Sequence, residues 1–469
     1  MSPENRPRLV HAEDPPGGEL EISPTFSEDD LALRFTARHG DDLRFIAAWG
    51  AWFRWDGARW QRDKTLRAFD FARKVCRDAA GEIMTDPTLK KSPSPITSAK
   101  TVAAVVSLAK SDRRHAAQTE DWDRDQWLLN TPGGTVALHD GVLRPHDRAD
   151  LITKIIAVAP GGRCPLWLKF LHRAFAGDQA LIDFVQRMAG YCLTGSIREH
   201  ALFFLHGTGA NGKGVFLNTL RGILAEYATV APITTFVASR TEQHPTDLAA
   251  LRGARAVIAQ ETEEGQRWAE AKIKALTGGD PLTARFVRQD FFTFEPSFKL
   301  IIAGNHRPAL RAVDEAVRRR FNLVPFRTVI PPAERDQSLP EKLKAEWPGI
   351  LSWMIEGCLE WQRMGLAQPP AVTTATEAYL AAEDAIGRFI DERCELTGQG
   401  DPHLQSVADL FASWQDWCST TGEYAGSAKR FSQSLEDRGL ERQRHPKTRR
   451  KCFAGLRLVV FAPDAGRKS

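Results

Sequence analysis

Strand-like and helix-like segments alternate from Ala201 onward, and this alternation constrains the fold more than any other feature of the chain. The segment "ALFFL" is a short apolar strand, and after a glycine-rich stretch Phe216, Leu220 and Leu224 recur at helical spacing. Three more apolar strands follow in "ARAVIA", "FKLIIAG" and "FNLVPF", separated by helical or hairpin segments. This pattern predicts an α/β core, in which helices cover a mostly parallel sheet.

A glycine-rich loop joins the first of these strands to the first helix. Its sequence "GTGANGKG" fits the phosphate-binding pattern GxxxxGK[ST], except that Gly214 stands where the pattern has a hydroxyl. Glycines let backbone N–H groups point at phosphate oxygens, the helix amino terminus adds positive potential, and Lys213 can reach the outer phosphates. The predicted nucleotide-binding residues are Gly207, Thr208, Gly209, Ala210, Asn211, Gly212, Lys213, Gly214 and Val215.

Polar side chains follow the later strands. Glu261 comes directly after a strand, where its carboxylate can polarise a water and hold a metal through water, although a surface acidic turn is the alternative. Asn305 follows "IIAG" and can orient the lytic water or sense a terminal phosphate, but Asn before a turn is also common structurally. The arginines at 318–320 can reach a neighbouring subunit's phosphate or form a surface patch.

The segments before Ala201 read as a mixed α+β region. Ser27 can cap a helix, and Asp56-Gly57 and Asp140-Gly141 are hairpin turn signals. Four tryptophans in "WGAWFRWDGARW" favour a packed core over a base-stacking surface. Residues 1–27 are rich in Pro, Glu and Gly without periodicity and predict a disordered leader.

The C-terminal region concentrates positive charge. Between Lys429 and Arg457 there are ten Lys or Arg and three acidic residues, a net +7, so the rest of the chain carries −3. The chain reads as helical from Pro332 to about Leu366, then "AQPPAVTT" marks a linker. Helices over 386–396, 407–418 and 428–438, followed by a basic hairpin, suggest a winged helix-turn-helix that binds nucleic acid, with a solvated basic face as the alternative.

Composition excludes several classes of protein. The seven cysteines are widely spaced without a CxxC pair, so they support neither a zinc ribbon nor a disulfide framework and are expected to be reduced. No apolar run reaches the roughly 18 residues of a membrane helix, and the first residues lack the apolar core of a signal peptide. We therefore expect a cytoplasmic protein without membrane contact.

Four segments occur in a fixed order: "GTGANGKGVF", "RAVIAQETEEGQRW", "KALTGGDPLTARFVRQDFFTFEPSFKLIIAGNHRP" and "AVRRRFNLVPF". Together they closely resemble the superfamily 3 helicase module of phage, plasmid and poxvirus primase-helicases. The stretch "DQWLLNTPGGTVALHDGVLRPHDRADLITK" resembles the domain that precedes this module, and the C-terminal region resembles the tail of the same proteins. The resemblance covers roughly residues 45–460.

The resemblance implies a phosphate-loop, AAA+-like ATPase that unwinds DNA as a ring, usually a hexamer, while moving on single-stranded DNA. The implied cofactors are ATP and Mg²⁺, with the ion held by phosphate oxygens, by water and, through water, by Glu261, since Gly214 offers no hydroxyl. The matched catalytic residues are Lys213 in Walker A, Glu261 in Walker B, Asn305 as the polar sensor and Arg320 as first choice for the arginine finger.

DNA contacts are expected from two regions. The segment between the second and third motifs also reads as a hairpin with Arg288 at its tip, where a basic group can grip phosphates in the channel of the ring. Lys274 and Arg285 are weaker candidates, because both can instead pair with Asp280. The tail candidates are Lys429, Arg430, Arg449 and Arg450.

These observations define one main hypothesis, an ATP-dependent helicase of phage or plasmid replication acting on single-stranded and forked DNA. The alternative is a non-enzymatic initiator in which ATP only assembles the ring; a small-molecule kinase is disfavoured, because no lid or acceptor pocket would explain the basic tail. Only about 45 residues precede the recognised region, so we expect no primer synthesis and a separate primase or polymerase as partner.

The predicted domains are a disordered leader over 1–27, a helicase-associated domain over 28–195, an ATPase core over 196–330, a helical extension and linker over 331–375, and a winged-helix DNA-binding domain over 376–469.

Overall fold

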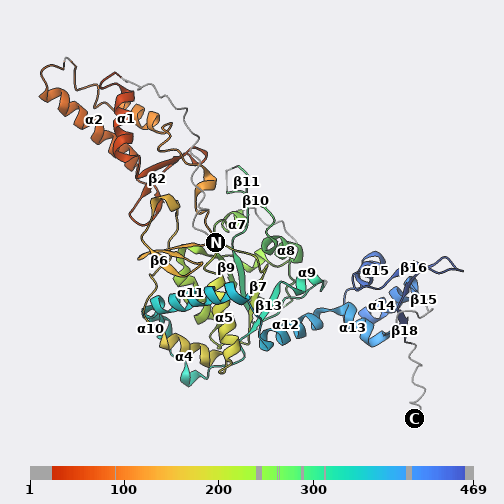
Figure 1. Ribbon diagram of the computed structural model, residues 1–469. Helices are drawn as coiled ribbons and strands as arrows, with labels where there is room; N and C mark the ends of the chain where they lie inside the picture. Colours follow the sequence, from red (N-terminus) through yellow and green to blue (C-terminus); the bar gives the residue numbers. More distant parts are fainter. Residues whose placement is uncertain are drawn as a thin grey trace, which may run out of the picture. The chain divides into compact units, whose positions relative to one another are not determined.

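A computed structural model of the chain describes residues 24–89, 91–238, 246–260, 262–263, 265–286, 290–310, 313–397 and 404–459 (Figure 1). The chain divides into two compact units, one made of residues 1–124 and 146–154 and the other of residues 125–145 and 155–469. Within these described ranges, none of the helices has the length and apolar character needed to span a membrane. The predicted domain ranges stay predictions.

The first unit combines three helices with a three-stranded antiparallel sheet. Its helices are α1 (Glu28–His39), α2 (Arg67–Thr85) and α3 (Ala99–Ala109), and its strands are β1 (Leu43–Ile46), β2 (Ala51–Trp55) and β3 (Trp60–Arg62). Ser27 caps α1 as predicted, since its hydroxyl accepts a hydrogen bond from the Asp30 backbone N–H at 3.1 Å. The side chains of Trp52 and Trp60 are buried, which confirms that these two tryptophans form core.

The centre of the second unit is a five-stranded sheet with the strand order β13-β7-β12-β9-β8. Every neighbouring pair in it is parallel, which confirms the predicted parallel sheet. The four apolar segments read from the sequence form four of its strands, and a short fifth lies at one edge. The strands are β7 (Leu202–His206), β8 (Ala228–Val230), β9 (Ala256–Gln260), β12 (Lys299–Gly304) and β13 (Phe321–Pro325).

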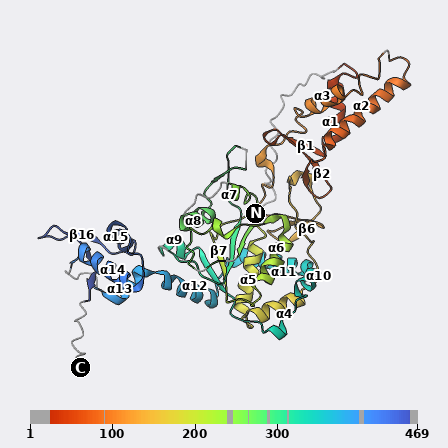
Figure 2. The ribbon, with the colours of Figure 1, turned by 180° about the vertical axis from the view of Figure 1, so that it is seen from behind.

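Helices cover both faces of this sheet, because its side chains alternate between two separate cores. Phe203 and Leu205 of β7 belong to one core, whereas Leu202 and Phe204 belong to the other. The first core is completed by α4 (Pro165–Ala174), α5 (Gln179–Tyr191), α6 (Lys213–Leu224), α10 (Leu339–Ala345) and α11 (Trp347–Met364), which are grouped in Figure 2. The second is completed by α7 (Thr246–Ala249), α8 (Glu270–Gly278), α9 (Glu315–Arg318) and α12 (Pro370–Glu383).

Two hairpins of the second unit agree with the sequence. The strands β4 (Leu128–Thr131), β5 (Gly134–Ala137) and β6 (Val142–Arg144) form an antiparallel sheet that turns at Asp140-Gly141. The strands β10 (Leu282–Ala284) and β11 (Phe292–Phe294) pair antiparallel, which confirms the hairpin expected between the second and third motifs. Its predicted tip residue, Arg288, lies outside the described residues.

The predicted linker "AQPPAVTT" is wrong in its second half, because helix α12 begins there at Pro370. Proline at the first turn of a helix sacrifices no intrahelical hydrogen bond, so the prolines that suggested a linker instead start the helix. Tertiary contacts then hold α12 against the sheet: Thr376 Oγ1 accepts from the Leu323 backbone N–H at 2.9 Å, and the Tyr379 hydroxyl accepts from Trp268 Nε1 at 2.8 Å.

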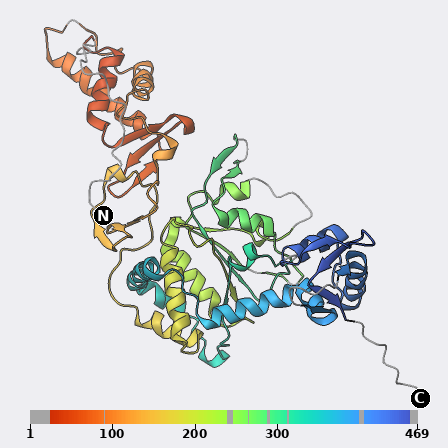
Figure 3. The same cartoon turned by 45° about the vertical axis from the view of Figure 1, so that its right-hand side comes forward.

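The C-terminal helices and strands, blue in Figure 3, surround a core of their own. They are α13 (Ala385–Arg393), α14 (Val407–Thr421), α15 (Ala428–Glu436), β14 (Cys394–Leu396), β15 (Leu404–Ser406), β16 (Arg442–Arg444), β17 (Lys451–Ala454) and β18 (Leu456–Leu458). Three helices and the basic β16–β17 hairpin occur as predicted. Residues 394–396 were expected to be helical but form a strand, since they pair with β18, which is distant in sequence.

All seven cysteines are free and buried.

Candidate nucleotide site

The glycine loop runs from the end of β7 to Lys213, the first residue of α6. Two glycines are required by its path. A Cβ at position 207 would lie 2.2 Å from the carbonyl oxygen of Phe326, and a Cβ at position 212 would lie 2.8 Å from Phe170 Cε2. Gly212 also has φ +88, a left-handed conformation that costs other residues free energy. The loop therefore passes too close to Phe326 and Phe170 for a side chain at these two positions.

Lys213 turns its amine back into this loop. Its Nζ donates hydrogen bonds to the backbone carbonyl of Gly207 and to Asn305 Oδ1, the second at 2.9 Å. The side chain is only 8% exposed, and burial lowers the pKa of its amine to about 8. A bound anion would favour the charged form of this amine, so the position suits phosphate.

The sheet brings Asn305 to Lys213 although the two residues are far apart in sequence. Strands β7 and β12 are adjacent and parallel, with His206 opposite Gly304, so their carboxyl ends meet at one edge. A pocket of about 550 Å³ opens at this edge, which is within the size range of small-molecule sites, about 300–1,000 Å³. The pocket is lined by Lys213, Gly214, Leu217, Gln260, Thr262, Glu263, Ala303, Gly304, Asn305 and His306.

Besides the glycine loop and the end of β12, the end of β9 also lines the pocket. Glu261 itself lies outside the described residues, but its neighbours Gln260 and Thr262 both line the pocket. The Thr262 hydroxyl donates to the carbonyl of His306 at 2.5 Å and ties the two strand ends together. Sequence reasoning missed Gln260, Thr262 and His306, although each is adjacent to a residue of a recognised motif.

The residues present fit a nucleotide, and they leave room for the hydroxyl that the loop lacks. Position 214 does not require glycine, because a Cβ there would meet nothing within 4 Å and the residue is not among the glycines with positive φ. Among the described residues, no group of three His, Cys, Asp or Glu side chains is arranged to hold a metal ion. Glu261, the predicted indirect metal contact, is outside that set.

The three arginines before β13 differ in their surroundings. Arg320 is 7% exposed, and its guanidinium donates to Thr277 Oγ1 at 3.1 Å and to the Ala316 carbonyl at 2.8 Å. Arg318 lies 3.6 Å from a carboxylate oxygen of Asp384. Arg319 is exposed. The sequence could not distinguish these environments, since the three residues are identical in type.

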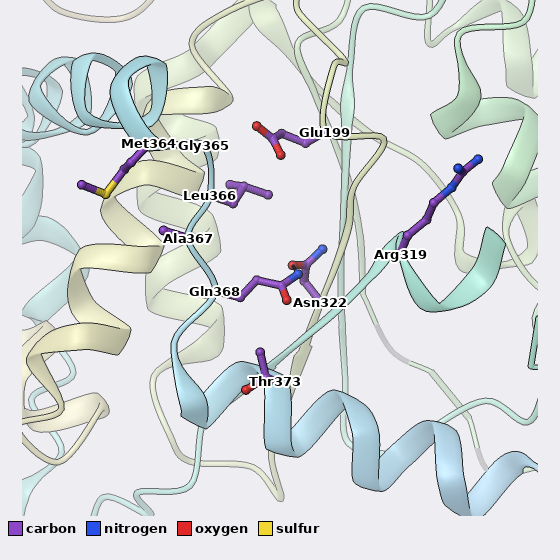
Figure 4. Close-up of a pocket in the computed structure, with 9 residues that line it drawn as sticks. All are labelled: Glu199, Arg319, Asn322, Met364, Gly365, Leu366, Ala367, Gln368 and Thr373. Atoms are coloured by element: carbon purple, nitrogen blue, oxygen red, sulfur yellow. Dashed lines mark hydrogen bonds between the residues drawn. The ribbon is translucent and has the colours of Figure 1, made fainter. Parts of the chain in front are cut away.

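Arg319 also lines a second pocket, of about 480 Å³, near the amino end of β13. Figure 4 shows its guanidinium directed away from the amides of Asn322 and Gln368. This edge of the parallel sheet is opposite to the edge with the glycine loop. Arg319 therefore lies across the sheet from the glycine-loop pocket of its own chain.

The predicted DNA contacts are mostly exposed. Lys274 forms an ion pair with Asp314, and not with Asp280 as one interpretation of the sequence allowed. The Arg285 guanidinium lies over the ring of Phe291, 4.8 Å from its centre. The tail candidates are exposed on α15 and in the β16–β17 hairpin: Lys429, Arg430, Arg449 and Arg450.

Fold and site together define a class: a parallel-sheet α/β protein with a lysine-bearing glycine loop at the carboxyl edge of the sheet. Residues 32–176 match the family described as D5 N terminal like, and residues 205–320 match a family of unknown function, DUF5906. A solved structure of the C-terminal region of NrS-1 has a similar fold, with a TM-score of 0.52 at 10% identity, covering 92% of this chain and 100% of that one.

Two viral proteins are related in sequence. The chain is 25% identical over 322 residues to "Putative helicase L207/L206" of Acanthamoeba polyphaga mimivirus, covering 63% of this chain and 33% of that protein. It is 25% identical over 309 residues to "Putative helicase 022R" of Frog virus 3 (isolate Goorha), covering 61% of this chain and 30% of that protein. The chain thus spans about a third of the length of these relatives. These matches support the resemblance to phage and viral primase-helicases that the motifs indicated.

Proposed function

We propose that this chain is an ATP-dependent DNA helicase of phage or plasmid replication that moves on single-stranded DNA as a ring. The observation that carries the proposal is the 2.9 Å hydrogen bond between Lys213 Nζ and Asn305 Oδ1 inside the pocket. A lysine at the start of a helix, beside a polar side chain at the next strand end, is the arrangement that phosphoryl transfer from a nucleotide needs.

In the proposed reaction, water attacks the terminal phosphorus of ATP and the bond to the bridging oxygen breaks, giving ADP and phosphate. Backbone N–H groups of the loop hold the inner phosphates, and Lys213 neutralises charge that develops on the outer ones. Glu261 polarises the attacking water and Asn305 orients it. Mg²⁺, when bound, would screen the charge of the phosphates, and Glu261 would hold it through water.

A ring would let a second subunit complete each site. Arg320 matches the position of the family's finger, but its guanidinium is bonded within its own chain. Arg318 and Arg319 are both exposed, but Arg318 pairs with Asp384. In a head-to-tail ring we therefore assign the trans-acting role to Arg319, at the edge opposite the loop, and a supporting role to Arg320.

Two surfaces are proposed to bind DNA. The β10–β11 hairpin carries Arg285 and the predicted tip residue Arg288, and it would contact phosphates in the channel. The C-terminal helices and basic hairpin would act as a winged helix, and the net +7 between Lys429 and Arg457 would attract the DNA backbone.

DNA-stimulated ATP hydrolysis separates this proposal from an initiator that only binds ATP. We expect hydrolysis that rises with single-stranded DNA, unwinding of a fork, and rings in negative-stain images with ATP and forked DNA. ATP-dependent rings without hydrolysis would instead establish the non-enzymatic initiator. Persistent hydrolysis by Lys213→Ala, in preparations free of contaminating ATPases, would show that this pocket is not the catalytic site.

A further inference from the structure

Two more basic side chains flank the phosphate loop and have no part in the function proposed so far. His206 is the last residue of β7, directly before the loop, and Arg307 follows Asn305 by two residues. The Nε of Arg307 donates a hydrogen bond to His206 Nε2 at 3.4 Å. The side chains from two adjacent strand ends are therefore joined beside the pocket.

His206 is the neutral member of this pair. Burial, then the charge of Arg307, then that of Lys213 lower the pKa of its imidazole to about 4. Because Nε2 accepts from Arg307, this nitrogen carries no proton, and the tautomer follows from the hydrogen bond. His206 thus lies within electrostatic reach of both cations and can accept from Arg307 without adding charge.

The positive charge of Arg307 is not neutralised by a neighbouring carboxylate among the described residues. Its side chain is exposed, and no carboxylate forms an ion pair with it in the described part of the chain. Glu383 interacts with it only through longer-range electrostatics. Lys213 lines the pocket, and Arg307 directly follows the lining residue His306. Two cations in these positions, with a neutral histidine bonded to one of them, form a site suited to an anion with more than one charge.

We propose that Arg307 is a second cation of the nucleotide pocket, which contacts the terminal phosphate of a nucleoside triphosphate bound to the same chain, and that His206 positions it. This inference rests on the proposed function. Lys213 Nζ meets Asn305 Oδ1 in the pocket, and Arg307 follows Asn305 by two residues. A nucleotide whose inner phosphates lie in the loop would place its terminal phosphate on the side of Asn305. The contact is made in cis, unlike that of an arginine from a neighbouring subunit.

Selectivity between nucleotides tests the contact. Dissociation constants for ATP and ADP are measured with Mg²⁺ for wild type, Arg307→Ala and the control Arg363→Ala, which removes an exposed arginine of α11 paired with Glu360. We expect Arg307→Ala to weaken ATP binding about tenfold or more, with little change for ADP. The control should leave both unchanged. An unaltered ratio of ADP to ATP affinity in Arg307→Ala would overturn the proposal.

The positioning role has its own readout. His206→Gln keeps an acceptor for the guanidinium and should retain the preference for ATP, whereas His206→Phe removes the acceptor and should lower it. Thermal unfolding of both variants establishes that they fold alike. Equal loss of preference in the two variants, with intact folding, would contradict positioning by a hydrogen bond.

Mixed assemblies distinguish cis from trans contact. If Arg307 acts in cis, mixing Lys213→Ala with Arg307→Ala protein leaves the half-saturating ATP concentration as high as in Arg307→Ala alone, because neither chain holds both groups. Mixing Lys213→Ala with Arg319→Ala should restore part of the hydrolysis rate and shows that subunits exchange. A return to the wild-type half-saturating ATP concentration in the first mixture would refute the cis contact.

The two proposals fail in different ways. Normal ATP binding and hydrolysis by Lys213→Ala would remove the proposed function and this inference together. Loss of both in Lys213→Ala, with an unchanged nucleotide preference in Arg307→Ala, would leave the function standing and reject the role of Arg307 alone.

Discussion

Two glycines of the phosphate loop lie only two positions apart, and we expect the same substitution to have opposite effects on them. Gly212 has φ +88, and a Cβ there would lie 2.8 Å from Phe170 Cε2. Gly214 lies in helix α6 without a positive φ, and a Cβ there would meet nothing within 4 Å. Gly212→Ala and Gly214→Ala therefore form a matched pair.

The magnitudes follow from these surroundings. The left-handed backbone costs an alanine roughly 1–2 kcal/mol. The ring of Phe170 is buried and packs on Trp167, so it cannot move freely, and such overpacking costs about 1–3 kcal/mol more. Gly212→Ala should thus lower the free energy of unfolding by roughly 2–5 kcal/mol. Gly214→Ala should raise it by about 0.4–1 kcal/mol, because it restricts the unfolded chain at a compatible site.

Urea unfolding followed by tryptophan fluorescence measures both effects, and nucleotide affinity reports on the loop. We expect Gly212→Ala to unfold at lower urea and to bind ATP poorly, since the added methyl group displaces the loop. Gly214→Ala should unfold at the same or higher urea and bind ATP normally. Equal midpoints for the two variants, or a more stable Gly212→Ala, would refute the reasoning.

Four further predictions concern metal binding, the arginine finger, a buried lysine and DNA binding. Gly214→Ser restores a possible Mg²⁺ ligand, so half-saturating Mg²⁺ in ATP hydrolysis should fall with little change in maximal rate; an unchanged titration would show that the ion never meets this position. Arg319→Ala should slow ATP hydrolysis by about 10³-fold or more and leave ATP affinity intact. Arg320→Ala should also lower the free energy of unfolding, because it removes a buried hydrogen bond to Thr277. If only Arg320→Ala hydrolyses slowly, and it folds normally, the finger is Arg320. Burial lowers the pKa of Lys299 to about 7, whereas a lysine in the unfolded chain titrates near 10.4. Between these pH values the unfolded state binds more protons, so the free energy of unfolding should rise with pH by up to about 1.4 kcal/mol per pH unit. Lys299→Met should lose this pH dependence. Replacing Arg449 and Arg450 together by Ala should reduce the log–log salt slope of single-stranded DNA binding by about 0.7 per lost contact, and an unchanged slope would reduce the basic block to a solvated face.

Local features of this protein were determined by the sequence alone. The four apolar strands, the loop before α6, the Ser27 cap and the turns at Asp56-Gly57 and Asp140-Gly141 all occur as predicted. Each depends on residues within about a dozen positions of one another, through backbone preference, periodicity or a short side-chain hydrogen bond. The order of the four motifs along the chain was likewise sufficient to indicate the family.

Tertiary structure decided everything that depends on which distant segments meet. Strand order places Asn305 beside Lys213 and Arg307 beside His206, because parallel neighbours bring their carboxyl ends to one edge. Packing against β13 turned an expected linker into helix α12. Among identical arginines, only the fold buried Arg320 and left Arg319 exposed. The physical reason is common to all three: burial and pairing are set by contacts between residues far apart in the chain, and neither composition nor periodicity encodes which of them will touch.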